Sequence, residues 1–201
     1  MAVVSPRAEA GERGANRERI LRAALNVVAQ EGVDKVTHRS VATRAGVSPG
    51  TVTYHFASRE DLVRQAFALY VTDYEQSLVQ SLTERPLASV ADIIAFLSSI
   101  TALNPGATDL ATIEYEMLGF AGRDEETKMR VAGWSRALEG WLTDPLEALG
   151  ARRPMEAARQ LMAICRGSEF EVMARGQTLP AEQFRSRLET VLSGLLVSSS
   201  G

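Results

Sequence analysis

The segment that most constrains the fold is "VTHRSVATRAGVSPGTVTYHF", residues 36–56, because it predicts two short helices joined by a tight turn. The first helix is predicted over residues 38–45, since Thr37 is a suitable N-cap and Gly46 is typical of a helix end. Both histidines of the chain lie in this segment, among many other hydrogen-bonding side chains. A helix of about two turns is unstable alone, so the segment needs support from a neighbouring element.

The second short helix is predicted over residues 49–55, with Ser48 as its N-cap and Pro49 at its first position. An amphipathic period over residues 16–31 predicts a longer helix before the pair, with Asn16 as its N-cap. A longer helix that supports two short ones around a tight turn indicates a helix-turn-helix, whose second short helix usually lies in the major groove of DNA. The alternative interpretation is a plain connector rich in Ser and Thr.

The charge of the chain is divided unevenly between its two ends. Residues 1–60 hold nine Arg and Lys against six Asp and Glu, whereas residues 61–201 hold thirteen against nineteen. A basic head on an acidic body favours a polyanion as the partner of the head. A chance imbalance is the alternative.

Several classes of protein are disfavoured by what the sequence lacks. Cys165 is the single cysteine, so no disulfide framework or cysteine metal site is expected, and a reducing cytoplasm is the predicted location. The first fifteen residues hold no apolar core of a signal peptide, and no apolar run is long enough for a membrane span. The stretch "GWSRA", residues 133–137, falls short of the hydrolase elbow, and no histidine follows it. No enzyme, catalytic residue, metal site or cofactor is therefore predicted.

The rest of the chain shows helical periods bounded by Gly and Pro, and no strand pattern. The predicted fold class is all-α with about nine helices, and a helix over 59–83 is expected to leave the head. Pro145 is expected to kink or break one later helix, and Pro154 and Pro180 to start two others.

A longer stretch around the first segment, "GVDKVTHRSVATRAGVSPGTVTYHFASREDLV", resembles the DNA-binding domain of the TetR family of bacterial transcriptional regulators. The positions that carry the resemblance are Gly32, Thr37, Ala42, Ala45, Gly46, Val47, Ser48, Gly50, Thr51, Tyr54, His55, Phe56, Arg59, Glu60 and Leu62. Two positions depart from the family pattern: Thr53 stands where an aromatic residue is frequent, and Arg59 where Lys is usual. The resemblance implies DNA contacts by His38, Arg39, Ser48, Pro49, Gly50, Thr51, Thr53, Tyr54, His55 and Arg59. A place in the small core is the alternative for His55.

The resemblance also implies a helical body that binds a small effector and forms a homodimer. Aromatic and polar residues on the helices that enclose the effector cavity in the family are Phe67, Tyr70, Tyr74, Phe96, Glu114, Tyr115, Trp134, Trp141, Met162 and Arg166. Such a cavity is mostly apolar with a few placed polar groups, and plain core is the alternative for each aromatic residue. The last two helices hold more apolar surface than a small body easily hides, which favours a four-helix dimer interface, with an intrachain core as the alternative. Its predicted residues are Phe170, Met173, Phe184, Leu188, Val191, Leu192 and Leu195.

The predicted organisation has four parts. They are a flexible N-terminal arm over 1–15, a helix-turn-helix domain over 16–60, a helical effector-binding and dimerisation domain over 61–197, and a frayed tail over 198–201. The predicted function is a ligand-responsive DNA-binding regulator, with repression and release by a small molecule as family expectations. Its predicted partners are double-stranded operator DNA with a pseudo-palindromic sequence, a second copy of the chain and an unknown effector, and not a membrane. The alternative is a helical dimeric interaction or ligand-binding module without sequence-specific DNA binding.

Overall fold

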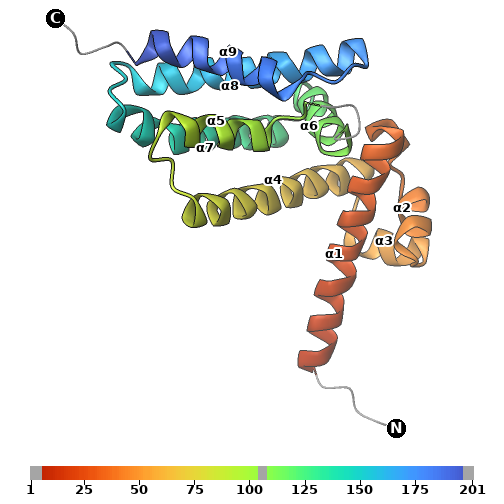
Figure 1. Cartoon of the computed structure of the whole chain (residues 1–201). Coiled ribbons are helices and arrows are strands. Elements are labelled where there is room, and N and C mark those ends of the chain that lie inside the picture. The colour runs from red at the N-terminus through yellow and green to blue at the C-terminus, as the bar shows by residue number, and fades with distance from the viewer. Residues whose placement is uncertain (1–5, 104–107, 197–201) are drawn as a thin grey trace, which may run out of the picture. The chain divides into compact units, whose positions relative to one another are not determined.

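The computed structural model describes residues 6–103 and 108–196, and over these residues it contains nine α-helices and no strand, which confirms the all-α prediction (Figure 1). The helices are α1 (Pro6–Glu31), α2 (His38–Ala45), α3 (Pro49–His55), α4 (Arg59–Glu84), α5 (Val90–Ile100), α6 (Thr108–Ala121), α7 (Glu125–Ala148), α8 (Pro154–Arg175) and α9 (Ala181–Leu195), with a short 3-10 turn, η1 (Val33–Lys35), after α1. None of the described helices combines the length and apolar character that crossing a membrane requires.

The first helix is longer than the sequence pattern predicts. α1 begins at Pro6, so the expected flexible arm is wrong from that residue onward, and Asn16 lies inside the helix. Instead of capping a helix, the Asn16 side chain accepts a hydrogen bond of 2.8 Å from Arg19. The early part of α1 has no apolar period, but it is rich in Ala, Glu and Arg, which have high helix propensity.

The ends of the two short helices follow the local sequence signals. α2 starts after Thr37, whose side chain accepts from the amide of Ser40 at 3.0 Å while the Ser40 hydroxyl accepts from the amide of Thr37 at 3.0 Å. The helix ends at Gly46, whose φ of 66° is readily adopted only by glycine. Ser48 then caps α3 by accepting from the amide of Thr51 at 3.1 Å. The reciprocal bonds at α2 and the single bond at α3 satisfy N–H groups that a helix start leaves unpaired.

Contacts divide the chain into two compact units that do not follow the predicted boundary at residue 60. The first unit holds the chain up to Tyr74 together with Thr112–Arg130, so most of α6 and the start of α7 belong with the helix-turn-helix. Its core includes the fully buried Phe67 on α4, whose ring lies 5.7 Å from that of Phe120 on α6. The core of the first unit therefore includes a segment that is distant in sequence.

The second unit holds Glu75–Ala111 and the chain from Val131 onward. α8 and α9 lie side by side in it, and α9 also packs against α5 (Figure 1). Pro145 lies inside a continuous α7, so the break allowed by the sequence does not occur there. Pro154 opens α8 as predicted, whereas Pro180 is the N-cap of α9 and not its first residue.

Candidate nucleic-acid interface and effector site

α3, the second short helix of the helix-turn-helix and therefore its recognition helix, has one buried and one exposed face. Val52 and the C-cap residue Phe56 are fully buried and fix the helix to the rest of the first unit. Thr53 and Tyr54 lie on the exposed face, and Tyr54 has 72% of its surface exposed. A tyrosine at such exposure leaves its ring and hydroxyl available to a partner, as DNA contacts require. Pro49 and Gly50 are also exposed, at the start of the helix.

The stretch of sequence that contains α2 and α3 holds no acidic residue. From Lys35 to Arg59 the chain contains no Asp or Glu. The side chain of Arg39 on α2 is exposed, whereas Arg44 donates to Gln30 at 2.7 Å and to Glu31 at 2.8 Å. A segment without carboxylates can approach phosphate groups without like-charge repulsion.

The two histidines of the segment are both half-buried. Nε2 of His38 lies 3.2 Å from the carbonyl oxygen of Phe56, which can only accept, so this nitrogen donates. This bond joins the start of α2 to the end of α3. The ring of His55 contacts the ring of Tyr54 edge-on, with centroids 5.2 Å apart. His38 is therefore a link within the first unit, and its predicted DNA contact remains a prediction.

Arg59 is half-buried, and each of its three guanidinium nitrogens has a partner within the protein; Nη1 donates to Oε1 of Glu60 at 3.4 Å. Its Nε donates to the carbonyl of Val36 at 2.9 Å, and its Nη2 donates to the carbonyl of Val33 at 2.7 Å. A carboxylate oxygen of Asp34 lies 3.6 Å from Nη2, and Arg123 lies 3.9 Å from the same oxygen. The sequence could not reveal these bonds, because both carbonyls lie more than 20 residues away along the chain.

An ion pair inside the first unit joins α4 to the turn between α6 and α7. Nη2 of Arg64 lies 2.8 Å from Oδ2 of Asp124, and the amide of Thr127 donates to Oδ1 of Asp124 at 2.8 Å. The hydrogen bond from Arg64, together with the one from the Thr127 amide, outweighs the effect of burial and lowers the pKa of Asp124 from 3.8 to about 2. The pair attaches the segment around residue 124 to the helix that follows the helix-turn-helix.

The predicted effector residues fall into both contact units. The members in the first unit are Phe67, Tyr70, Tyr74, Glu114 and Tyr115, and those in the second are Phe96, Trp134, Trp141, Met162 and Arg166. That these ten line one cavity remains a prediction. Each group nevertheless contains a buried polar contact. A buried acid is unusual in a protein core unless it is hydrogen-bonded.

The buried polar contact of the first unit is the bond from the Tyr70 hydroxyl to Oε1 of Glu114, at 2.8 Å. In the second unit, the buried Glu169 accepts from Arg166 at 3.0 Å and from the amide of Ala102 at 3.1 Å. The Arg166 guanidinium also lies 5.3 Å from the centroid of the Trp134 ring. These contacts place charged groups beside aromatic rings, the combination expected for a site that orients an organic ligand.

The predicted dimer residues separate into two sets. Phe170 and Met173 on α8 are exposed at 64% and 41% of their surfaces. Phe184, Leu188 and Leu192 on α9 are almost completely buried within one chain, so they belong to the core of that chain, and their predicted place in the dimer interface remains a prediction. Periodicity predicted an apolar face on α9, but the helices of the same chain cover it.

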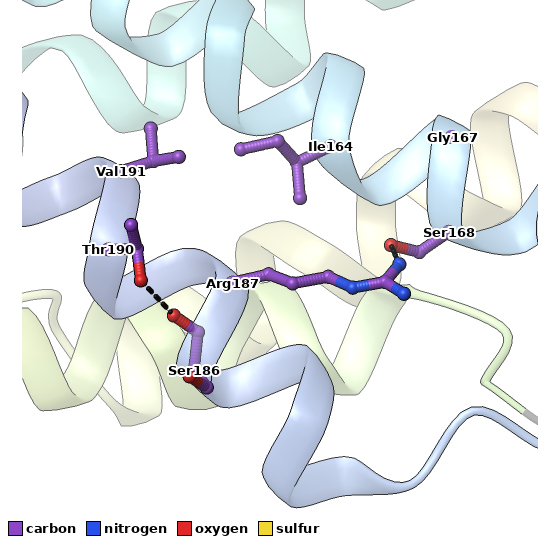
Figure 2. A pocket seen from close by; sticks show the side chains of 7 residues that line it. All are labelled: Ile164, Gly167, Ser168, Ser186, Arg187, Thr190 and Val191. Carbon is purple, nitrogen blue, oxygen red and sulfur yellow. Dashed lines mark hydrogen bonds between the residues drawn. The ribbon is translucent and has the colours of Figure 1, made fainter.

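An open groove of about 520 Å³ lies between α8 and α9 (Figure 2). The aliphatic side chains of Ile164 and Val191 line it, and Arg187 extends along it and donates to the Ser168 hydroxyl at 3.3 Å. Gly167 also lines the groove, where the absence of a side chain allows close approach. Of these residues only Val191 was predicted; the spacing of Ile164 and Gly167 on one face of α8 was the available signal. The predicted Leu195 lines a second, smaller cavity.

Comparisons with known proteins agree with this architecture. Residues 20–66 match the family described as "Bacterial regulatory proteins, tetR family", and residues 85–196 match "Tetracyclin repressor-like, C-terminal domain". The HTH-type transcriptional regulator UidR of Escherichia coli is 24% identical over 110 residues, 55% of this chain and 54% of UidR. The chain thus spans about half the length of that relative. An uncharacterized HTH-type transcriptional regulator of Xanthobacter autotrophicus, from the dhlA 5' region, is 27% identical over 94% of this chain and 95% of that protein.

Solved structures show the same fold. A transcriptional regulator from Rhodococcus sp. Rha1 has a TM-score of 0.77 at 21% identity, covering 90% of this chain and 95% of that one. The multidrug binding protein EbrR, complexed with ethidium, has a TM-score of 0.67 at 25% identity, covering 88% and 97%. The family matches to both parts of the sequence decide the classification: this chain belongs to the tetR family of bacterial regulatory proteins.

Proposed function

We propose that this chain is a homodimeric DNA-binding transcriptional regulator, a repressor that a small molecule releases from its operator. Family membership and the names of the relatives as transcriptional regulators support the class of function. The observation that carries the proposal is the exposed face of α3, where Tyr54 stands out in a stretch without carboxylates from Lys35 to Arg59. A helix of this shape and charge fits the major groove of DNA.

Capture of genomic fragments by the purified protein tests DNA binding and identifies the operator. Tyr54→Ala is expected to weaken binding to the captured fragment by about 1–3 kcal/mol, the range of a specific contact. Met129→Ala is the matched control, because Met129 is a similarly exposed apolar residue of the first unit outside the helix-turn-helix. If the parent retains no fragment, the chain is instead a helical module without sequence-specific DNA binding.

We place the dimer contact on α8 and on the groove between α8 and α9. Phe170 and Met173 are exposed apolar residues on α8, and Gly167 and Ile164 line the groove beside them. Two such surfaces related by a twofold axis would bury these residues against one another. Phe170→Glu is expected to give monomers in light scattering, because a carboxylate loses its hydration in an apolar interface. The control Met155→Glu changes another exposed residue of α8 and is expected to remain dimeric.

An effector site is proposed among the predicted residues of the second unit, Phe96, Trp134, Trp141, Met162 and Arg166. The ligand-bound EbrR and a choline-bound regulator from Saccharomonospora viridis support a small organic molecule as the effector. The two tryptophans of the chain, Trp134 and Trp141, both belong to this set, so quenching of tryptophan fluorescence reports on binding. Choline and a panel of aromatic organic cations are suitable probes, with Trp141→Phe as the variant that assigns the signal. A panel that leaves the fluorescence of both tryptophans unchanged while releasing the operator contradicts this placement.

A further inference from the structure

Two hydrogen-bonded links close the helix-turn-helix at its ends. The first is the bond from Nε2 of His38, the first residue of α2, to the carbonyl of Phe56, the C-cap of α3. The second is formed by Arg59, the first residue of α4, which donates to the carbonyls of Val33 and Val36. Val36 directly precedes Thr37, the N-cap of α2. Arg59 therefore holds the backbone at the position where α2 begins.

The geometry of Arg59 is that of a two-pronged donor. Nε and Nη2 point along one edge of the planar guanidinium, and they reach two carbonyls at 2.9 and 2.7 Å. The third nitrogen, Nη1, lies 3.4 Å from Oε1 of Glu60, a carboxylate that would repel a phosphate at this position. To bind phosphate through Nε or Nη2, Arg59 would have to give up its bonds to the two carbonyls. Loss of a charged donor weakens the turn, because hydrogen bonds to charged groups are among the stronger ones in proteins.

We propose that Arg59 is a positioning residue for DNA recognition: it fixes the η1 turn and the start of α2, and it does not itself bind phosphate. This inference rests on the proposed DNA-binding function. α2 packs against α1 and α3, so a loosened start of α2 disturbs the support of the recognition helix. Substitution of Arg59 is therefore expected to weaken DNA binding without changing the number of ionic contacts to phosphate.

Lysine distinguishes this role from a phosphate contact. A lysine at position 59 keeps the positive charge but carries one ammonium group, which cannot reproduce the fixed fork on two carbonyls. A phosphate contact would survive Arg59→Lys, whereas the hold on Val33 and Val36 would not. The salt dependence of DNA binding also separates the two roles. Binding weakens as salt rises, and each lost phosphate contact makes the slope of log K against log salt less steep by about 0.9.

The test compares Arg59→Ala and Arg59→Lys with the control Arg123→Ala. The control removes the other arginine near Asp34 but leaves the bonds of Arg59 in place. The first readout is amide hydrogen exchange in the DNA-free protein over residues 33–41. Both Arg59 variants are expected to exchange about tenfold faster there, the change that one charged hydrogen bond predicts, while the control matches the parent.

The second readout is affinity for the captured fragment over a range of salt concentrations. Both Arg59 variants are expected to bind about tenfold more weakly than the parent with an unchanged slope. The proposal is overturned if the slope becomes less steep by about 0.9 in Arg59→Ala while Arg59→Lys binds DNA like the parent. Unchanged hydrogen exchange in Arg59→Lys overturns the proposal as well. If Arg59→Ala does not fold, the exchange of Arg59→Lys alone decides the test. A parent that binds no DNA instead refutes the proposed function and removes the basis of the inference.

Discussion

Leu188 and Phe170 offer a quantitative test of which apolar residues of α8 and α9 belong to the core of one chain. Leu188 has none of its surface exposed, whereas Phe170 has 64% exposed. Leu188→Ala removes three buried carbon atoms, which costs about 2.4 kcal/mol in transfer free energy at about 0.8 kcal/mol each, and the cavity left behind raises the total to about 3–4 kcal/mol. Phe170→Ala in an isolated chain is expected to cost less than about 0.5 kcal/mol.

Urea unfolding followed by circular dichroism measures both variants at two protein concentrations about fiftyfold apart. Unfolding of a dimer depends on concentration, so the parent midpoint is expected to rise with concentration. Leu188→Ala is expected to lower the midpoint at both concentrations by a similar amount. Phe170→Ala is expected to reduce the concentration dependence while leaving the low-concentration midpoint near that of the parent. A parent-like midpoint for Leu188→Ala, with a changed oligomeric state, would refute the placement of Leu188 in the intrachain core.

Two further substitutions test strain and charge in the first unit. Gly32→Ala is expected to lower the free energy of unfolding by about 1–2 kcal/mol, because Gly32 has a φ of 89° and a new Cβ would lie 3.1 Å from Oε1 of Glu116. Gly14→Ala, which meets no atom within 4 Å, is the control, and equal midpoints for the two variants would contradict the strain. The pKa of Asp124, lowered to about 2 mainly by Arg64, means that the ion pair stabilises the fold fully above about pH 5 and that this stabilisation is lost as the pH falls towards 2. Between about pH 5 and pH 2 the parent is expected to lose about 1–2 kcal/mol more stability than Asp124→Asn, and parallel pH curves would exclude this role.

Features that depend on neighbours in sequence could be predicted in detail. The caps Thr37 and Ser48 and the left-handed Gly46 act within three or four residues, so their signals are complete in the sequence. The recognition helix was found for the same reason. The start of α1 was missed because residues before 16 lack the apolar period on which the prediction relied, although their propensity is helical.

Features that depend on distant partners could not be predicted. The sequence shows that Arg59 is basic, but not that its donors meet the carbonyls of Val33 and Val36. Likewise, an apolar stripe on α9 indicates that Leu188 is covered, but not whether the covering helix belongs to the same chain. Both questions are decided by packing between elements, which single-sequence periodicity does not encode.

The sequence-discontinuous first unit limits how this regulator can be recombined with others. A chimera joined after residue 60 would retain α1 to α3 but would lose their native partners in the rest of the first unit, such as Asp73 for Arg22 and Arg123 for Asp34. The transplanted head would then meet a foreign α4, α6 and α7. An engineered sensor built from this chain therefore needs to carry Thr112–Arg130 along with the N-terminal residues, as a two-segment graft.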